Sequence, residues 1–203
     1  LLHNDVKTIC GEGLDFYTKE PMLKDGELEW RDGPTESLDK EVLASVEQPF
    51  KPDGGLSVLD GNLGRGVIKT SALRTPHCVL KAPAVVFEDQ FELDEAFKSG
   101  ALDKDCIVVV RFQGPSAIGM PELHRLTPPL GVLQDRGFKV ALVTDGRMSG
   151  ASGKVPAAIH VTPEAYKGGL LAKVQDGDVI ELNTETGALT LHVDDETLAA
   201  REA

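Results

Sequence analysis

One segment of the sequence combines glycines, a serine and two cations directly after an apolar run. The run Lys139–Thr144 predicts a buried strand, and the segment Asp145–Lys154 follows it without a break. Its glycines permit close backbone approach to a ligand, so they can present the hydroxyl of Ser149 with little steric cover. Arg147 and Lys154 could then hold an anion beside that hydroxyl. An ordinary strand-to-helix turn with a serine N-cap explains the same residues, and their types alone do not separate the two interpretations.

A second loop, Gln113–Glu122, also follows an apolar strand and ends in a proline and a carboxylate. Pro121 suits the first turn of a helix, which predicts that Glu122 lies beside a helix N-terminus. There the carboxylate stays ionised, as a hard cation such as Mg²⁺ requires of its ligand. The alternative is a glutamate that only complements the helix dipole. His124 is expected on a helix face without a chemical role.

A third loop, Gly61–Gly66, is rich in glycine and carries Arg65, with Lys69 just beyond it. Such a turn could bind a phosphate or a carboxylate through its cations and backbone. It lacks the GxGxxG order and does not open a long helix, which argues against a dinucleotide site. A tight turn with exposed cations is the alternative interpretation.

Two familiar motifs are excluded around Ser149. A nucleotide-binding loop requires G-x-x-x-x-G-K-S/T, but Met148 stands where the first glycine belongs and Val155 replaces the hydroxyl residue that would bind Mg²⁺. The hydrolase elbow G-x-S-x-G is also absent. Because no general base is evident nearby, Ser149 needs outside help to act as a base or nucleophile, and a metal centre is the natural source of that help.

Composition limits the class of protein and its partners. The 203 residues can bury one good core, and their net charge of −12 disfavours nucleic acid and anionic membrane surfaces as partners. Apolar runs stay short of the ~18 residues that a membrane span needs. The opening residues lack signal-peptide features and a starting methionine, which suggests a fragment or a processed product.

The cysteines Cys10, Cys78 and Cys106 are widely spaced and form no CxxC pair. An odd number without pairing spacing is typical of a reducing compartment, so the sequence predicts a cytoplasmic protein. Ligation of a metal cluster by these three alone is disfavoured. Cys106 lies in an apolar run and is expected to be a small buried hydrophobe.

Residues 1–50 differ in character from the rest of the chain. Asp25–Pro34 is acidic and turn-rich, Ser37–Val46 predicts a short helix, and Gln48–Gly55 is typical of a linker. We therefore expect residues 1–50 to form a tail and a connection, and residues 51–203 to form the folded domain.

From Leu56 onward, short strands and short helices alternate. The predicted strands are Val67–Thr70, Ala84–Phe87, Ile107–Phe112, Lys139–Thr144, Val179–Asn183 and Ala188–Val193, of which the last two flank a turn and predict a hairpin. The predicted helices are Asp94–Lys98, Leu130–Arg136 and Glu196–Ala203. Many short strands with few long helices predict a mixed α/β fold, namely a barrel-like β domain with peripheral helices.

Taken together, the motifs closely resemble those of the dihydroxy-acid dehydratase/6-phosphogluconate dehydratase family. The matching segments follow the family's order and are Gly61–Leu63, Gly114–Pro115, Gly119–Glu122, Thr144–Arg147, Ser149–Gly150 and His160–Ala165. Dihydroxy-acid dehydratases usually carry Ala-Pro-Glu after the Gly-Asn-Leu and Glu-Gly-Pro in the second loop. Gly64–Gly66, Gln113–Pro115 and Met148–Pro156 look like the 6-phosphogluconate dehydratase branch instead.

The resemblance implies a hydro-lyase that removes water from 6-phospho-D-gluconate to give 2-dehydro-3-deoxy-6-phospho-D-gluconate in the Entner-Doudoroff route. It implies that Ser149, as an alkoxide, removes the C2 proton, and that Glu122 is a ligand of Mg²⁺. Glu122 precedes Ser149 by 149 − 122 = 27 positions, which is the family's spacing. An iron–sulfur cluster, by resemblance of the 4Fe-4S type, would act as a Lewis acid on the departing C3 hydroxyl.

The same resemblance implies how the substrate and the rest of the protein bind. Arg65, Lys69, Gly150 and Lys154 are candidate substrate-binding residues, because an extra phosphate favours cations. The family's cluster ligands are cysteines of its N-terminal domain, so none of the iron–sulfur ligands is expected in this chain, which should be inactive alone. The implied partners are the N-terminal domain of the same polypeptide and a second copy in a homodimer.

Family chains are much longer than this one, so the resemblance also assigns its parts. Residues 1–50 correspond to the tail of the N-terminal cluster-binding domain plus a linker, and residues 51–203 to a C-terminal domain of the swivelling β/β/α type. Two alternative functions stay open. One is dehydration of a non-phosphorylated aldonic or branched dihydroxy acid, which Arg65, Gln113 and Lys154 disfavour. The other is a non-catalytic anion-binding domain of the same fold.

Overall fold

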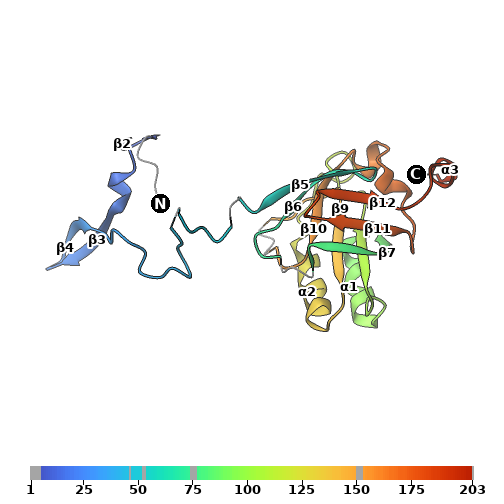
Figure 1. Cartoon of the computed structure of the whole chain (residues 1–203), viewed down its shortest axis with the longest axis horizontal. Helices are drawn as coiled ribbons and strands as arrows, with labels where there is room; N and C mark the ends of the chain where they lie inside the picture. The colour runs from blue at the N-terminus through green and yellow to red at the C-terminus, as the bar shows by residue number, and fades with distance from the viewer. Residues whose placement is uncertain (1–5, 46, 52–53, 74–76, 150–152, 203) are drawn as a thin grey trace. The chain divides into compact units, whose positions relative to one another are not determined.

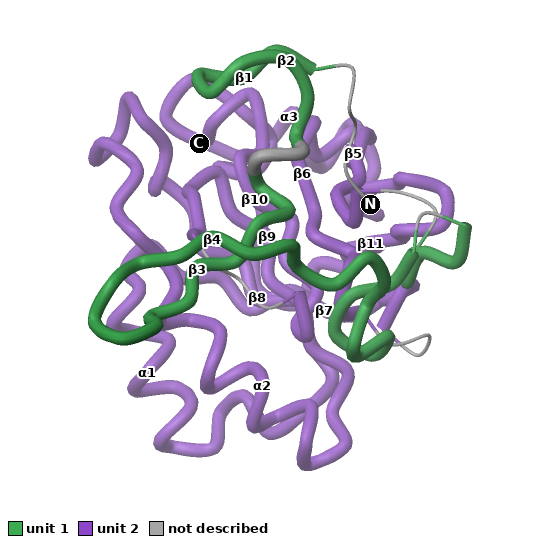
Figure 2. The backbone as a smooth tube through the Cα atoms, turned by 90° about the vertical axis from the view of Figure 1, so that its left-hand side faces the viewer, with its two compact units in different colours: residues 1–52 green, residues 53–203 purple. Residues whose placement is uncertain are grey.

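The structure is a computed structural model that describes residues 6–45, 47–51, 54–73, 77–149 and 153–202. It divides into two compact units, Leu1–Pro52 and Asp53–Ala203, which Figure 2 shows in different colours. The second unit holds a closed barrel, and the first holds two small two-stranded sheets.

Eight strands of the second unit close into the barrel (Figure 1). In chain order they are β5 (Leu56–Gly61), β6 (Gly64–Lys69), β7 (Val79–Phe87), β8 (Cys106–Val110), β9 (Val140–Thr144), β10 (Ala157–Thr162), β11 (Val179–Asn183) and β12 (Ala188–Leu191). Around the ring the order is β10-β6-β5-β12-β11-β7-β8-β9, and β9 pairs with β10 to close it. The pairs β7–β8, β8–β9, β9–β10 and β12–β5 are parallel, and the other neighbours are antiparallel.

Side chains that alternate along the strands fill the barrel. In β7, Leu80, Ala82 and Ala84 are buried in the barrel core, as the period of two along a strand requires. β8 and β9 differ because all five residues of each strand are buried. Their inward residues join the barrel core, and their outward residues join a second core. Burial on both faces is typical of parallel strands that helices cover on the outside.

The helices α1 (Gln90–Ser99) and α2 (Thr127–Asp135) provide that cover, as the crossovers from β7 to β8 and from β8 to β9. α1 begins with a capping box between Asp89 and Glu92 and ends at Gly100 in the left-handed conformation. In the described part of the chain, no helix has both the length and the apolar character to cross a membrane.

The C-terminal helix α3 (Asp195–Ala200) is followed by a part-buried ion pair. Arg201 donates from Nη1 and Nη2 to the carboxylate of Asp178, at 2.5 Å and 2.9 Å, and from Nη1 to the carbonyl of Lys173. The side chains of Arg201 and Asp178 are only 14% and 10% exposed. Burial by itself would raise the pKa of Asp178, but the hydrogen bonds from Arg201 and from the Gln175 N–H outweigh burial and lower it.

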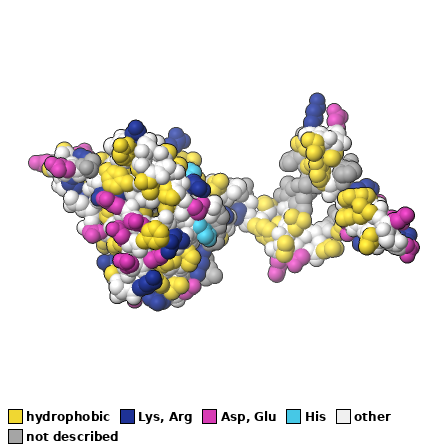
Figure 3. Space-filling model, turned by 180° about the vertical axis from the view of Figure 1, so that it is seen from behind, with side chains coloured by type: hydrophobic (Ala, Val, Ile, Leu, Met, Phe, Trp, Pro, Cys, Tyr) yellow, Lys and Arg dark blue, Asp and Glu magenta, His cyan; other side chains and the backbone are white. Residues whose placement is uncertain are grey.

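The first unit is built on an antiparallel hairpin. Its elements are β1 (Lys7–Thr8), β2 (Gly11–Glu12), the 3-10 helix η1 (Asp15–Thr18) and the hairpin strands β3 (Lys19–Lys24) and β4 (Glu27–Asp32). Asp25 and Gly26, both with positive φ, form the two-residue turn of the hairpin. None of the residues of this unit whose exposure the structure describes is buried, and Figure 3 shows apolar side chains at its surface.

The predicted mixed α/β fold with a barrel-like sheet and few helices is confirmed. The structure adds β5 and β10, which the sequence did not predict as strands, and it begins β7 at Val79 instead of Ala84. Ser57 interrupts the apolar residues of β5, which ends in Asp60 and Gly61, and His160 interrupts those of β10, so their local preference for a strand is weak. Their pairing within the closed ring makes them strands.

One prediction for the first unit is wrong. Ser37–Val46, predicted as a short helix, forms turns in its described residues, with a single i→i+4 hydrogen bond from the Leu43 N–H to the Asp39 carbonyl. The acidic and turn-rich segment Asp25–Pro34, for which the sequence predicts no strand, contains the whole of β4. Cross-strand ion pairs and an apolar pair stabilise that strand, and such long-range pairing is not visible in a local turn pattern.

Replacing Asp178 with Asn should lower the free energy of unfolding, because Arg201 is left without its counter-charge in a part-buried site. The pKa of Asp178 lies below its ordinary 3.8 in the folded chain. The stabilisation is therefore complete above that value and is lost as the pH falls through the lowered pKa. Urea denaturation of both proteins between pH 7 and pH 3 measures this difference. A difference that does not shrink at the acid end would contradict the prediction.

Candidate active site

Two loops meet at the carboxyl ends of β8 and β9. Val110 and Thr144, the last residues of these parallel strands, are register partners, so the loops that follow begin side by side. We call residues 111–123 the glutamate loop and residues 145–149 the serine loop. An isolated parallel β-bridge between Glu122 and Arg147 joins them. The structure therefore brings together the two residues that the sequence singled out 27 positions apart, Glu122 and Ser149.

The carboxylate of Glu122 binds the end of the serine loop. The Ser149 N–H donates to both carboxylate oxygens, at 2.9 Å to Oε1 and 3.2 Å to Oε2. The Ser149 side chain also forms a hydrogen bond with this carboxylate. Ser149 is exposed, so a substrate from solvent has access to its hydroxyl.

These contacts hold the pKa of Glu122 below its ordinary value of 4.5. The hydrogen bond from the Ser149 side chain is the largest cause, followed by the Ser149 N–H; the His124 N–H, 3.0 Å from Oε1, and the Arg147 guanidinium add to them. A depressed pKa means that the charge on Glu122, and the contacts that need it, persist until the pH falls through the lowered value. Glu122 is therefore an anion at neutral pH.

Arg147 holds the glutamate loop at three points. Its Nη1 donates to Glu122 Oε2 at 2.9 Å, its Nε donates to the Met120 carbonyl at 2.8 Å, and its own carbonyl accepts from the Leu123 N–H at 3.2 Å. Met120 has a φ of 54°, which is uncommon for a residue other than glycine. Surrounding contacts must hold a backbone of this kind in place, and the Arg147 hydrogen bond is one of them.

The helix predicted to begin at Pro121 is wrong. Glu122 lies in the β-bridge, the 3-10 helix η3 (His124–Leu126) comes next, and α2 starts only at Thr127, with prolines in its first turn. The N–H groups that bind the carboxylate belong to Ser149 and His124. The charge of Glu122 thus has a cause other than the expected helix dipole, namely contacts across two loops.

Two of the candidate substrate-binding cations lie on β6. Arg65 and Lys69 are exposed and share the outward face of the strand, because side chains four positions apart point the same way. Lys69 packs beside Gly153, which lies four residues beyond Ser149. The Lys69 Cγ is 3.3 Å from the place that a Cβ on Gly153 would occupy. The structure therefore brings Lys69 beside the glycine-rich segment.

Lys154, the third candidate cation, forms an ion pair with Asp135 in the last turn of α2, with an N–O distance of 2.6 Å. No local pattern in the sequence predicts this partner, because Asp135 and Lys154 meet only through the fold. Gly150, the remaining candidate, lies outside the described residues.

The glycine-rich loop before Arg65 has a structural role. Asn62 and Leu63 form the two-residue turn between β5 and β6. The Asn62 side chain accepts from the Leu191 N–H and donates to the Leu191 carbonyl, both at 2.8 Å, so it extends the pairing of β12. Leu63 is fully buried in the barrel core. The side chain of Arg65, in the same loop, is exposed and accessible to a ligand.

Metal-ligating side chains are sparse. Within the residues that the structure describes, no group of three or more His, Cys, Asp and Glu side chains could hold a metal ion. Burial raises the pKa of Cys106 to about 11, so its thiol stays protonated in the second core, as expected for a buried hydrophobe. A cation at Glu122 would need further ligands from beyond the described residues.

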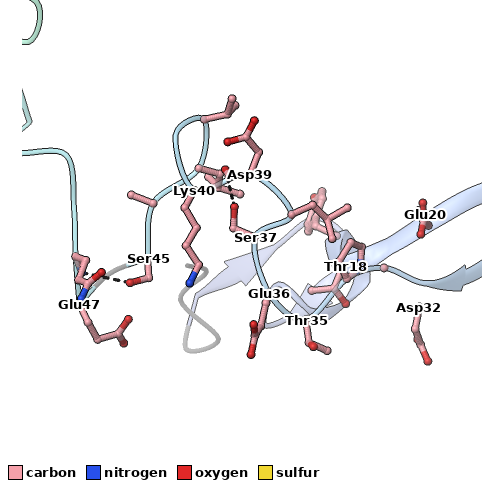
Figure 4. Close-up of a pocket in the computed structure, with 18 of the residues that line it drawn as sticks. Thr18, Glu20, Asp32, Thr35, Glu36, Ser37, Asp39, Lys40, Ser45 and Glu47 are labelled. Carbon is pink, nitrogen blue, oxygen red and sulfur yellow. Dashed lines mark hydrogen bonds between the residues drawn. The ribbon is translucent and has the colours of Figure 1, made fainter.

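A separate hollow lies in the first unit, and Figure 4 shows its lining. The labelled residues include Glu20, Asp32, Glu36, Asp39 and Glu47, with Lys40 as the labelled cation. Carboxylates in this excess repel an anion, so the hollow does not suit the anionic substrate that the family resemblance implies.

Comparison with known proteins gives one consistent result. A family model described as dihydroxy-acid/6-phosphogluconate dehydratase C-terminal matches residues 41–203. The chain is 66% identical to phosphogluconate dehydratase of Escherichia coli K12, over 100% of the chain and 34% of that protein. It is 60% identical to phosphogluconate dehydratase of Pseudomonas aeruginosa, over 99% and 33%, and 37% identical to dihydroxy-acid dehydratase of Ignicoccus hospitalis, over 100% and 34%. The chain spans about a third of the length of these relatives.

Replacing Ser149 with Ala should raise the pKa of Glu122 toward 4.5, because the Ser149 side chain is the largest cause of its depression. A ¹³C NMR titration of the carboxyl groups of this chain measures the shift. Ser116→Ala, a serine replacement in the glutamate loop that leaves Glu122's partners intact, should not change the pKa. Equal Glu122 pKa values in the Ser149→Ala and unmodified proteins would refute the contact.

Proposed function

Because the chain belongs to the dihydroxy-acid/6-phosphogluconate dehydratase family, we propose that it supplies the serine loop of a full-length hydro-lyase. That enzyme would dehydrate 6-phospho-D-gluconate to 2-dehydro-3-deoxy-6-phospho-D-gluconate, a step of the Entner-Doudoroff pathway. The contact between Ser149 and Glu122 at the ends of two parallel strands is the observation that carries the proposal. Support for the substrate comes from relatives named phosphogluconate dehydratase at 66% and 60% identity.

The reaction sets two requirements that this site addresses in part. The C2 proton, next to a carboxylate, is weakly acidic, and hydroxide is a poor leaving group from C3. We assign the first task to Ser149, whose alkoxide oxygen takes the C2 proton as the C3–O bond breaks. The departing hydroxide takes that proton back from the Ser149 hydroxyl and leaves as water, which regenerates the alkoxide; the resulting enol then becomes the 2-keto product. A serine is a base only if nearby positive charge depresses its pKa. The serine loop carries one such charge, that of Arg147. Its guanidinium binds the carboxylate of Glu122, and the same carboxylate accepts a hydrogen bond from the Ser149 N–H.

The proposal includes Mg²⁺ with Glu122 as one ligand. A carboxylate with a lowered pKa and a side chain 36% exposed has the chemistry of such a ligand. Its Oε2 accepts one short bond, from Arg147, and shares the longer contact with Ser149 N–H, so it retains acceptor capacity. When bound, the cation would supply stabilisation of negative charge on the substrate carboxylate.

We further infer that the full-length enzyme holds an iron–sulfur cluster, of the 4Fe-4S type, whose ligands lie in the part of the relatives that this chain does not cover. The three described cysteines do not make up a ligand set for a cluster: Cys10 is exposed in the first unit, Cys106 is a buried, protonated thiol in the second, and Cys78 alone is too few. This chain alone is therefore expected to lack dehydratase activity.

Arg65, Lys69, Gly150 and Lys154 are our proposed binding residues for the anionic sugar-acid phosphate. Arg65 and Lys69 present two positive charges on one face of β6, and Lys69 lies beside Gly153. Lys154 follows Gly153 in the chain and forms an ion pair with Asp135. A few cations on one part of the surface can dominate locally over a net charge of −12.

The hairpin of the first unit supports a domain proposal. Its register places Leu23 opposite Leu28 and Pro21 opposite Trp30 on one face, with ion pairs on the other. Leu23, Leu28 and Trp30 are 76%, 62% and 56% exposed. An isolated hairpin is marginally stable, so this apolar face needs a partner. We propose that residues 1–50 are the tail of an N-terminal cluster-binding domain plus a linker, and that this domain covers the face.

The remaining assignments follow from the same proposal. Residues 51–203 would be a C-terminal domain of the swivelling β/β/α type, and the full-length enzyme would be a cytoplasmic homodimer. The match to a dihydroxy-acid dehydratase at 37% identity favours a second candidate, dehydration of a non-phosphorylated aldonic or branched dihydroxy acid. The third candidate is a non-catalytic anion-binding domain, which turnover by the full-length protein would exclude.

In the full-length, anaerobically purified enzyme, Ser149→Ala should reduce kcat by about 10²–10⁴-fold, the usual effect of removing a well-placed base. Formation of the 2-keto product measures turnover, and Ser116→Ala serves as the control that should retain activity. Failure of the unmodified enzyme to convert 6-phosphogluconate would refute the proposed function. Appreciable turnover by folded Ser149→Ala would refute only the role of the serine.

Replacing Lys154 with Met should raise KM for 6-phosphogluconate by about tenfold, the value of one hydrogen bond to a charged group. KM for gluconate, which lacks the phosphate, should change much less. Lys98→Met, at the end of α1, is the matched control. Equal changes for both substrates would show that Lys154 does not bind the phosphate.

A further inference from the structure

We propose that Asp145 and Glu164 are positioning residues that fix the glutamate loop relative to Ser149. Both carboxylates are buried, with 2% and 9% of the residue exposed, and the proposed chemistry uses neither. The inference rests on the proposed function, because the geometry that they fix is that of Glu122 and Ser149.

Asp145 connects three segments of the barrel edge. It is the first residue of the serine loop, its Oδ1 accepts from the Gln113 N–H at 2.9 Å, and its Oδ2 accepts from the Ala165 N–H at 2.9 Å. Gln113 stands at the start of the glutamate loop and is itself 2% exposed, with its side-chain amide bonded to the carbonyls of Glu88 and Arg111. One carboxylate thus ties the origin of the glutamate loop to the origin of the serine loop.

Glu164 adds a second attachment to the same loop. Its oxygens lie 3.3 Å and 3.1 Å from the Ser116 N–H, three residues beyond Gln113. A Cβ on Gly114 would lie 2.0 Å from Glu164 Oε2, so the glutamate occupies the space that a side chain at this position would fill. Glycine at position 114 is therefore required by the approach of the carboxylate.

The electrostatics of the two groups support a positioning role. Among the residues that the structure describes, the ion pairs include neither Asp145 nor Glu164, and their bonded donors are backbone N–H groups. A buried carboxylate needs such donors to offset its lost hydration, so each donor is held at a defined place. These N–H groups belong to the loop that carries Glu122 and to the residue after Glu164.

The path from this attachment to the reacting groups is short and rigid. Gly146 follows Asp145, its N–H bonds to the Thr144 hydroxyl, and its carbonyl accepts from the His160 N–H. A Cβ on Gly146 would lie 2.6 Å from Leu123 Cδ1 and 2.8 Å from Gln113 Cβ, so the two loops pack without free space. A displacement at Asp145 is therefore passed on to Leu123, the neighbour of Glu122.

The test uses the full-length enzyme with Asp145→Asn, which keeps the size of the side chain but turns an NH₂ group toward one of the two N–H donors. We expect kcat to fall by about 10²-fold, the effect of a 1 Å misplacement of reacting groups. KM for 6-phosphogluconate should stay within about twofold, because the proposed binding cations lie on β6 and at residue 154. Hydrogen–deuterium exchange of residues 113–122 should become faster.

Asp105→Asn is the matched control. Asp105 accepts the Lys139 N–H at 2.8 Å, at the amino ends of the same two strands, so it joins β8 and β9 at the edge away from the loops. This variant should retain kcat and the exchange rate of residues 113–122. The proposal is overturned if Asp145→Asn retains both, or if its loss of turnover matches the fraction of unfolded enzyme.

If Asp145→Asn does not fold, Glu164→Ala takes its place under the same criteria. Ser116 is exposed, so its N–H can bond to water when the carboxylate is removed, and the fold should survive. Faster exchange of residues 113–122 with reduced kcat supports the proposal, and unchanged values overturn it. The exchange measurement does not depend on turnover, so an enzyme inactive on 6-phosphogluconate would refute the proposed function while leaving the attachment testable.

Discussion

The parallel pairing of β8 and β9 is the constraint on which the rest of the second unit depends. Each of the five residues in both strands is buried, and their apolar side chains lie alternately in the barrel core and in the core beneath α1 and α2. A shift of one residue would exchange every inward side chain for an outward one, so the register is strongly specified. Because Val110 and Thr144 are fixed as partners, the two loops that follow have a common origin.

From that origin, polar contacts of increasing exposure lead to the surface. Asp145 is buried and bonds only to backbone N–H groups, whereas Arg147 and Glu122 are part-exposed and charged, and Ser149 is exposed. The buried groups define where the loops run, and the exposed ones are available to a ligand. Separating these duties lets a reactive hydroxyl be open to solvent while its backbone is held by the interior.

The sequence predicts the elements of this arrangement better than their contacts. The apolar runs of β8 and β9 and the glycine-rich segments after them are local signals, so both loops could be identified from spacing and residue type. The ion pair of Lys154 with Asp135 and the bonds of Asn62 to Leu191 join residues distant in sequence, and no local pattern specifies them. Glu122 illustrates both outcomes. The sequence predicts that its carboxylate is ionised, but it attributes the ionisation to a helix N-terminus that the chain does not form there.

The barrel closes where β9 pairs with β10, and the segment between these strands begins with the serine loop. The backbone contacts of this seam include the pairs Leu142–Ala157 and Val143–Ala158, and the hydrogen bond from the His160 N–H to the Gly146 carbonyl. The pairing of β9 with β10 and the path of the serine loop are therefore coupled through the backbone. A ring opened at this pair would keep its other seven strand pairs but would release the Gly146 carbonyl, three residues before Ser149, so the site is more sensitive to this seam than the secondary-structure content is.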